Sequence, residues 1–358
     1  MVMNWQTRFI PGSRPDGTPV LSLLAKRTYC IAPGSVTPAD KQVGLCMQDT
    51  YDDPDNPLYA EVVAENDLIA YKPSTDVVIA GSARAPGGRR AYHVDCEASV
   101  GPLRKTIRVY GNRRARLKTF GGVSIEDPEP FERMSLGYRK AYGGTCRDRN
   151  GMIVSYFPNP IGIGFAVKGG IGEEADSLAV PNLEDPSSPV TGDNLVASKY
   201  EEWTSLPKPA SLGWTRRNFY PRYTWAGVLP EYLEVAGRNR DAMAGKYPEL
   251  AVTEIPRMDY RVFQGASEGL WGEQLAGDEP VSLTYLDPYH EKFQFDLPGE
   301  RPHLAFDIGD GPVELEPVLQ TVVIDKEKDL LTMLWRGCMD YGGIETLEHM
   351  PKFEFAAR

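Results

Sequence analysis

Residues 94–110, VDCEASV-GP-LRKTIRVY, alternate apolar and polar side chains on both sides of a Gly101-Pro102 pair. Strict alternation places the two kinds of side chain on opposite faces of a strand. A two-residue loop between such runs predicts a β-hairpin and fixes its register. The predicted facing pairs are Val94 with Val109, Cys96 with Ile107, Val100 with Leu103, and Asp95 with Arg108. The last pair joins opposite charges, which supports this register.

Lys105 is the one residue that breaks the hairpin pattern. It falls on the apolar side of its strand, in line with Leu103 and Ile107. A lysine can lay its aliphatic stem along an apolar surface and hold its amine in water. We therefore expect Lys105 at an edge of the sheet, with its amine in solvent.

The rest of the chain predicts a mainly β protein with a few short helices, antiparallel sheets and long loops. Gly (35) and Pro (30) recur every few residues and leave little room for long helices. The short runs between them are rich in β-branched and aromatic residues, which is typical of strands. Besides the hairpin, the predicted strands are Val20–Ile31, Thr75–Gly81, Val281–Leu286, Val318–Ile324 and Leu330–Arg336.

Two helical segments and one long loop are also predicted. Glu231–Tyr247 has helical spacing of apolar residues, and a further helical turn is expected near Glu268–Gln274. Gly169–Ser211 is rich in Gly, Ser, Pro and Asp, which favours a loop. A boundary near residue 200 divides the chain into a β-rich part, residues 1–200, and a part over residues 201–358 packed into the same globular unit.

Charge and cysteine usage narrow the function classes. The net charge of −11 disfavours nucleic-acid binding, because an acidic chain repels phosphates. A basic stretch from Arg104 to Lys118 is interpreted as a solvated face, or alternatively as a docking patch for an acidic protein. The number of cysteines is odd and no two have C-x-x-C spacing, which is typical of a protein in a reducing compartment. They are Cys30, Cys46, Cys96, Cys146 and Cys338. Without a secretory signal or an apolar run long enough to span a bilayer, the expected location is the cytoplasm, with no membrane insertion.

The pattern of chemically active residues indicates a protein that is not an enzyme and has no metal or cofactor. The four histidines, His93, His290, His303 and His349, lack the helical spacing of a zinc site. Carboxylates are plentiful, but no spacing brings a specific pair together for acid–base chemistry. A carboxylate-dependent hydrolase is kept as an alternative, which requires a deep pocket with two facing carboxylates.

A dense aromatic and basic cluster lies between Trp214 and Trp225. It contains Trp214, Arg216, Arg217, Phe219, Tyr220, Arg222, Tyr223 and Trp225. Such residues serve core packing, dominate protein-binding hot spots and also stack on single-stranded nucleic acid. The acidic net charge makes protein binding the better functional interpretation. Trp214, Arg222 and Trp225 are therefore candidate partner-binding residues.

Several short motifs are predicted to shape turns. Pro86-Gly87 and Gly162-Ile163-Gly164 are interpreted as tight turns. Lys72 and Asp76 are predicted to act structurally: Pro73 holds Lys72 extended, and the Asp76 carboxylate accepts backbone N–H bonds at the start of a strand.

The order of these motifs resembles a bacterial domain-of-unknown-function family found in type VI secretion clusters. The matching segments are YKPSTDVV (71–78), GSARAPGG (81–88), KTIRVYGNR (105–113), PFERMSL (130–136), AYGG (141–144), NPIGIGF (159–165), VPNLE (180–184) and YPRY (220–223). The resemblance extends from Trp5 to about Leu297. Departures at Arg114-Ala115, at Ser135 and after Ala266 indicate a divergent branch.

What the resemblance implies is an adaptor or chaperone of a secreted effector. The expected partners are the toxic effector and the valine-glycine-repeat or PAAR-tipped spike. Glycine-rich turns and long loops let a partner approach closely, so the expected interface contains Asn159, Gly162, Gly164, Asn182 and Glu184. The opposing interpretation is that these motifs brace the fold internally. A structural part of the secreted spike remains an alternative function.

Overall fold

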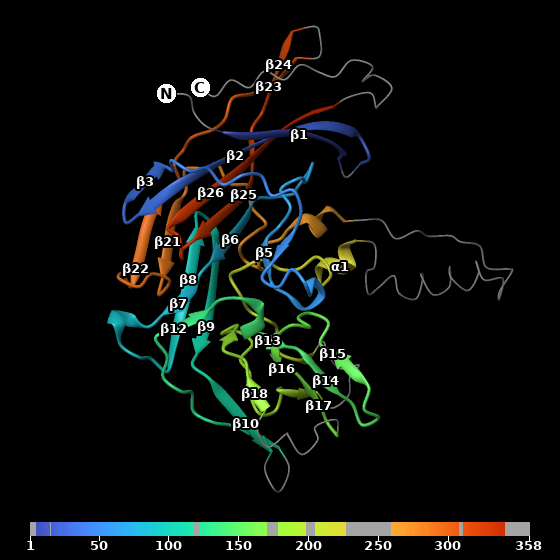
Figure 1. The fold of residues 1–358 in the computed structure, drawn as a ribbon, viewed down its shortest axis with the longest axis vertical. Coiled ribbons are helices and arrows are strands. Elements are labelled where there is room, and N and C mark those ends of the chain that lie inside the picture. The colour runs from blue at the N-terminus through green and yellow to red at the C-terminus, as the bar shows by residue number, and fades with distance from the viewer. Residues whose placement is uncertain are drawn as a thin grey trace, which may run out of the picture.

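The computed structural model describes residues 5–14, 16–117, 122–169, 178–197, 205–226, 259–307 and 311–340. Strands dominate this part of the chain, which confirms the mainly β class (Figure 1). Its helical elements are single turns: η1 (Pro57–Tyr59), η2 (Pro86–Gly88), η3 (Tyr138–Lys140), α1 (Arg222–Trp225) and η7 (Tyr260–Phe263). The predicted helix Glu231–Tyr247 and the predicted boundary near residue 200 lie outside the described residues.

The larger sheet joins strands from the two ends of the chain. Its order is β1 (Gln6–Ser13), β2 (Pro19–Ala32), β26 (Leu330–Asp340), β25 (Val318–Asp325) and β6 (Asp76–Ala80), with β3 (Ser35–Pro38) also on β2. All these pairs are antiparallel except β25 with β6, which run parallel with Thr321 opposite Asp76. The predicted strands in this sheet are confirmed, and the parallel pair is an exception to the expected antiparallel pattern.

The second sheet contains the predicted hairpin. Its order is β19 (Leu183–Glu184), β9 (Leu103–Tyr110), β8 (His93–Val100), β21 (Pro280–Thr284) and β22 (Lys292–Asp296). All four predicted facing pairs of the hairpin are confirmed. Asp95 and Arg108 form a bidentate ion pair, with 2.6 Å from Nε to Oδ1 and 2.7 Å from Nη2 to Oδ2.

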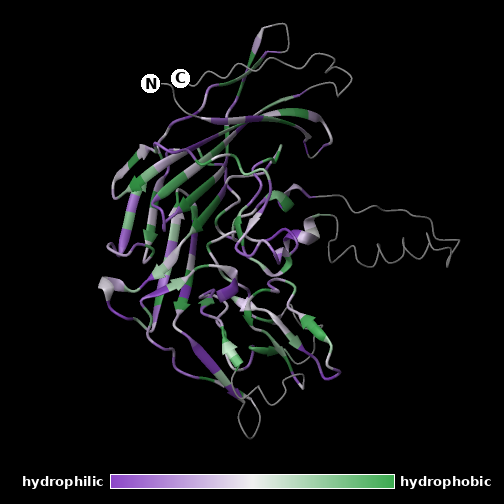
Figure 2. Cartoon of the chain, viewed as in Figure 1, coloured by the Kyte–Doolittle hydropathy of each residue, from purple (hydrophilic) through white to green (hydrophobic). Residues whose placement is uncertain are grey.

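One hydrophobic core joins the two sheets. Leu23 and Ile79 of the first sheet belong to the same buried cluster as Ile107 and Phe293 of the second. Such burial is the main stabilising contribution to the fold. Figure 2 shows the hydrophobic residues concentrated along these strands, whereas β10 (Arg113–Leu117) is mostly hydrophilic.

Short strands build a smaller region with its own core, which contains Tyr142, Tyr156, Phe165 and Leu195. Its pairs are β10 with β11 (Val123–Ile125) and β18 (Leu178–Val180), β13 (Tyr142–Gly143) with β16 (Ile163–Gly164), β14 (Thr145–Arg147) with β15 (Ile153–Ser155), and β17 (Ala166–Val167) with β20 (Val196–Ala197). The remaining pairs are β4 (Thr50–Tyr51) with β5 (Val62–Ala64), β7 (Ser82–Arg84) with β12 (Arg133–Ser135), and β23 (Leu304–Asp307) with β24 (Pro312–Leu315).

Two local predictions need correction. The described residues of the expected loop Gly169–Ser211 are mostly irregular, but they include the short strands β18, β19 and β20, because its few apolar residues pair with β10, β9 and β17. The helical turn expected over Glu268–Gln274 is absent. This segment makes irregular turns whose backbone contacts β9 and the start of β6.

Candidate functional site

A cavity of about 400 Å³ opens where the aromatic and basic cluster meets the second sheet. Its walls come from β9, η3, the segment after β15, the segment 206–225 and the segment 264–271. The lining residues used below are Lys105, Tyr138, Tyr156, Asp185, Lys208, Arg216, Arg222, Trp225, Gln264, Glu268 and Trp271. The volume lies within the range of ligand-binding pockets, roughly 300–1,000 Å³.

Aromatic rings form much of the wall. Trp225 and Trp271 meet edge to face, with ring centroids 5.9 Å apart, and both side chains are half-buried. Tyr156 donates its hydroxyl to the Pro207 carbonyl at 3.0 Å. The Tyr138 hydroxyl lies 3.0 Å from the Ser267 hydroxyl. These bonds anchor the tyrosines, so the cavity presents a preformed aromatic surface.

The two arginines of the wall are held by contacts within the protein. Arg222 is buried, forms an ion pair with Glu65 and donates from Nη2 to the Val262 carbonyl at 2.7 Å. Arg216 donates to the carbonyl oxygen of Ala60 at 2.6 Å and packs against the Phe219 ring. These contacts fix both arginines in the wall.

Lys105 differs from its sequence-based prediction. Its side chain is half-buried, lines the cavity and donates from its amine to the Glu268 carbonyl at 2.7 Å. The shielding of the amine from water lowers the pKa of Lys105, and nearby carboxylates only partly oppose this effect. The prediction failed because the segment 268–271 covers this part of β9, where the sequence pattern indicated an open edge.

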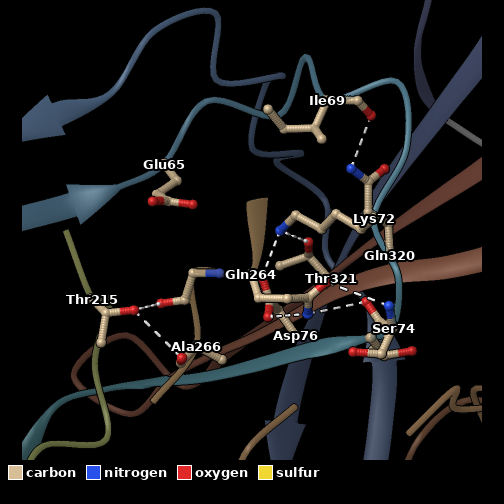
Figure 3. Close-up of polar contacts among 12 residues, drawn as sticks. Glu65, Ile69, Lys72, Ser74, Asp76, Thr215, Gln264, Ala266, Gln320 and Thr321 are labelled. Atoms are coloured by element: carbon tan, nitrogen blue, oxygen red, sulfur yellow. Dashed lines mark hydrogen bonds and ion pairs between the residues drawn. The ribbon is translucent and has the colours of Figure 1, made fainter. Parts of the chain in front are cut away.

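A buried polar network lies behind the cavity wall (Figure 3). The Lys72 amine lies 2.6 Å from Asp76 Oδ2 and donates to the Thr321 hydroxyl at 3.2 Å. Gln264, a cavity residue, donates to Asp76 Oδ1 at 2.8 Å, and the Gly265 amide donates to Oδ2 at 2.7 Å. The predicted structural role of Lys72 and Asp76 agrees with this geometry, although the backbone N–H comes from Gly265 and not from the local turn.

Trp214 lies beside this network and does not line the cavity. Its ring packs near the Lys72 amine, 5.9 Å from centroid to Nζ, and against Gly265, where an added Cβ would lie 2.7 Å from the indole. Of the three aromatic-cluster candidates, Arg222 and Trp225 therefore line the cavity and Trp214 supports its wall from behind.

The first group of expected interface residues lies inside the smaller region. The Asn159 side chain is fully buried and donates to the carbonyl oxygens of Tyr138 and Tyr142, at 2.8 and 3.1 Å. An added Cβ at Gly162 would lie 2.5 Å from the Ala141 carbonyl oxygen. Gly164 has φ +96° and packs against Pro181. This geometry supports the interpretation as an internal brace.

Asn182 and Glu184 are also buried. Glu184 forms an ion pair with the buried Arg113 and accepts the Val190 amide at 3.1 Å. Asn182 donates to the Tyr110 carbonyl oxygen at 3.2 Å. As the protein is folded here, neither side chain reaches the surface. Their role in partner binding stays a prediction, and their visible contacts are internal.

The other sequence motifs have local roles. Pro86 and Gly87 form η2, where Gly87 has φ +62°, a conformation that glycine adopts without strain. The basic stretch is largely paired with carboxylates of the chain: Arg104 with Glu97, Arg108 with Asp95, Arg113 with Glu184, and Arg116 with Glu126. This pairing favours its interpretation as a solvated strand face.

Two carboxylates, Asp185 and Glu268, line the cavity, which is where a hydrolase would need them. Glu268 is 80% exposed and lies 3.8 Å from the Lys208 amine on the rim. Asp185 accepts the amide and hydroxyl of Ser187, at 2.8 and 2.6 Å. Neither has the apolar burial that typically prepares a carboxyl group as a general acid.

Within the described part of the chain, no group of three His, Cys, Asp or Glu residues is placed to hold a metal. None of the described helices has the length and apolarity to cross a membrane. Sequence reasoning missed Tyr138, Tyr156, Lys208 and Trp271 as cavity residues. On β9, the one sequence signal for the cavity was Lys105, which stands on the apolar side of an otherwise alternating strand.

The chain matches a family described as "uncharacterized protein conserved in bacteria" (DUF2169) over residues 16–336. Because the match covers most of the sequence, the protein belongs to this family. No curated protein and no solved structure matches the chain.

Proposed function

We propose that this protein is a non-enzymatic adaptor of type VI secretion. It binds a toxic effector in the cytoplasm, keeps it stable and helps load it onto the valine-glycine-repeat or PAAR-tipped spike. The resemblance of its ordered motifs to a family of secretion accessory proteins is the basis for the secretion pathway and its partners.

The single observation that carries a binding function is the preformed aromatic cavity. Trp225 and Trp271 remain half-buried at a hollow surface, whereas the other three described tryptophans, Trp5, Trp214 and Trp335, are buried. Tryptophan, tyrosine and arginine dominate binding hot spots, and partner residues insert into such pockets. A rigid cavity also limits the entropy lost when a partner binds.

The secretion role is tested in a strain of the native host that lacks the gene. The spike should still be exported, whereas one effector should disappear from the medium and return when the gene is restored. Co-purification with the tagged protein, followed by mass spectrometry, should identify that same effector. Unchanged export of every effector would contradict the proposal. Recovery of the protein itself with the ejected needle would favour the structural spike alternative.

The binding site is tested with purified protein and the identified effector. Trp225→Ala and Trp271→Ala should each weaken the complex by about 2 kcal/mol, roughly 30-fold in Kd, the usual effect at a hot spot. Tyr289→Ala is the matched control, because Tyr289 is 89% exposed and does not line the cavity. If all three variants bind the effector as tightly as the wild-type protein does, the interface lies elsewhere.

A further inference from the structure

Lys105 has two carboxylates, Asp185 and Glu268, in the same cavity but is in salt-bridge contact with neither. Its side chain is half-buried at the cavity wall, and its amine donates a hydrogen bond to a neutral backbone carbonyl, that of Glu268. Across the described residues, no carboxylate forms a salt bridge with Lys105, and the Glu268 side chain lies near Lys208 on the rim. A partly desolvated ammonium group gains more from a hydrogen-bonded anion than a fully hydrated one does. The amine at the cavity wall is therefore placed to donate to a carboxylate of an occupant.

We propose that the cavity binds a segment of the partner protein in which an aromatic side chain stands next to a carboxylate. The aromatic ring packs against Trp225 and Trp271, and the carboxylate accepts a hydrogen bond from the Lys105 amine. This inference rests on the proposed adaptor function and specifies the chemistry of the effector segment that the adaptor recognises.

The dimensions and walls of the cavity fit this occupant. A space of about 400 Å³ accommodates one large aromatic side chain together with an adjacent acidic side chain. Both tryptophans are partly exposed, with Arg261 packed over the Trp225 ring at 5.0 Å, and a further aromatic contact with the exposed part contributes about 0.5–1.5 kcal/mol beyond burial. Lys105 lies on β9, and the hydrogen bond to the Glu268 carbonyl holds its amine at the cavity wall.

The charges around the cavity select a peptide over a nucleic acid. Asp185 and Glu268 line it, and the chain carries a net charge of −11. These charges act on every phosphate of a nucleic-acid backbone, whereas a single carboxylate meets the repulsion once and gains a hydrogen bond from Lys105. The rim lysine, Lys208, adds a second positive charge close to the entry.

Direct binding is measured by calorimetry with three capped hexapeptides that differ at two central positions. They contain Phe-Asp, Phe-Asn or Ala-Asp between Gly and Ser residues. The full-length protein should bind the Phe-Asp peptide at least about 10-fold more tightly than either of the others, which corresponds to ~1.4 kcal/mol. Equal binding of all three peptides, or no binding of any, would overturn the inference.

Variants of Lys105 assign the selectivity to its amine. Lys105→Met keeps the aliphatic stem and should abolish the preference for Phe-Asp over Phe-Asn, while Lys105→Arg should restore part of it. Lys292→Met is the control, because Lys292 is exposed on β22 outside the cavity and should leave the preference unchanged. Thermal unfolding of each variant verifies that it is folded. A Lys105→Met protein that is folded and keeps the full preference would disprove the role of the amine.

The identified effector separates this inference from the adaptor function. If the wild-type protein and Lys105→Met bind the effector equally, the inference fails and the adaptor function stands. If the wild-type protein distinguishes the peptides but its absence alters no effector export, the adaptor function fails and the cavity chemistry stands.

Discussion

Lys72 and Asp76 form a buried ion pair four residues apart with no helix between them, and their side chains are 4% and 0% exposed. The pair bridges to Thr321 on β25, which is also the register partner of Asp76 in the parallel strand pair. The extended chain at Pro73 and the start of β6 bring the two charges together. This contact connects the start of β6 to the centre of the larger sheet.

Asp76→Ala should destabilise the protein by about 3–5 kcal/mol, because it leaves the Lys72 ammonium buried without its anion. It also removes the acceptor of the Gln264 side chain and the Gly265 amide. Urea unfolding measures the change. Asp55→Ala is the control, because Asp55 is exposed and its replacement should leave the free energy of unfolding almost unchanged. An unchanged unfolding midpoint for Asp76→Ala would show that the pair does not stabilise the sheet.

Gly162→Ala should destabilise the fold by at least about 1–3 kcal/mol, the usual cost of an overpacked interior. The new methyl group would lie 2.5 Å from the Ala141 carbonyl oxygen and closer still to the Asn159 side chain. Gly44→Ala is the matched control, since an added Cβ there meets no atom within 4 Å. If Gly162→Ala has wild-type stability but loses the effector, the turn contacts the partner and is not only an internal brace.

Asp287 should contribute stability that is lost in acid. Burial alone would raise its pKa, but hydrogen bonds from Lys326, Tyr289 and His290 outweigh burial and lower the pKa from 3.8 to about 2. A carboxyl group with a lowered pKa in the folded state stabilises above its unfolded pKa, and the effect disappears as the pH falls through the folded pKa.

Asp287→Asn should therefore lower the free energy of unfolding by about 2 kcal/mol near neutral pH. The difference between variant and wild type should shrink as the pH falls from about 4 to about 2. Denaturant titrations at a series of pH values measure it. A difference in unfolding free energy that stays constant between about pH 4 and about pH 2 would argue against a lowered pKa of Asp287.

Lys105 should lose its proton at a lower pH than an ordinary lysine, whose pKa is 10.5, because its amine is shielded from water. The pH dependence of its acetylation, followed by mass spectrometry, should have a midpoint below that of a free lysine peptide. The preference for the Phe-Asp peptide should fall as the pH rises through this midpoint, since the neutral amine no longer attracts a carboxylate. A midpoint at or above that of the free lysine peptide would contradict the lowered pKa of Lys105.

Local alternation predicted the hairpin register down to Asp95 and Arg108, because a two-residue loop leaves little freedom to its strands. Four strands of the larger sheet, β2, β6, β25 and β26, were located from runs rich in β-branched and apolar residues, whereas β1 and β3 were not predicted. The strand order was not predicted either, since the pairing of β6 with β25 depends on contacts between residues distant in sequence. The short strands β18 to β20 escaped detection because pairing partners elsewhere in the chain, and not their composition, make them extended.

The candidate site was predicted only in part. The aromatic cluster indicated Arg222 and Trp225, and both line the cavity. Trp271 and Tyr138 carry no local signal, because only the tertiary fold brings them beside the cluster. The buried Asn159 and Glu184 were predicted at an interface from their turn-rich surroundings, a composition that also suits internal bracing.

The parallel pairing of β6 with β25 constrains how the chain is made. A ribosome completes Asp76 about 245 residues before Thr321. At roughly 5–20 residues per second, this delay lasts on the order of 10–50 s. Throughout it, the β6 edge lacks its neighbour and can pair with other exposed strands. A protein proposed to protect an effector is thus itself exposed to aggregation during synthesis, so its yield in the cell should depend on the chaperones that meet nascent chains.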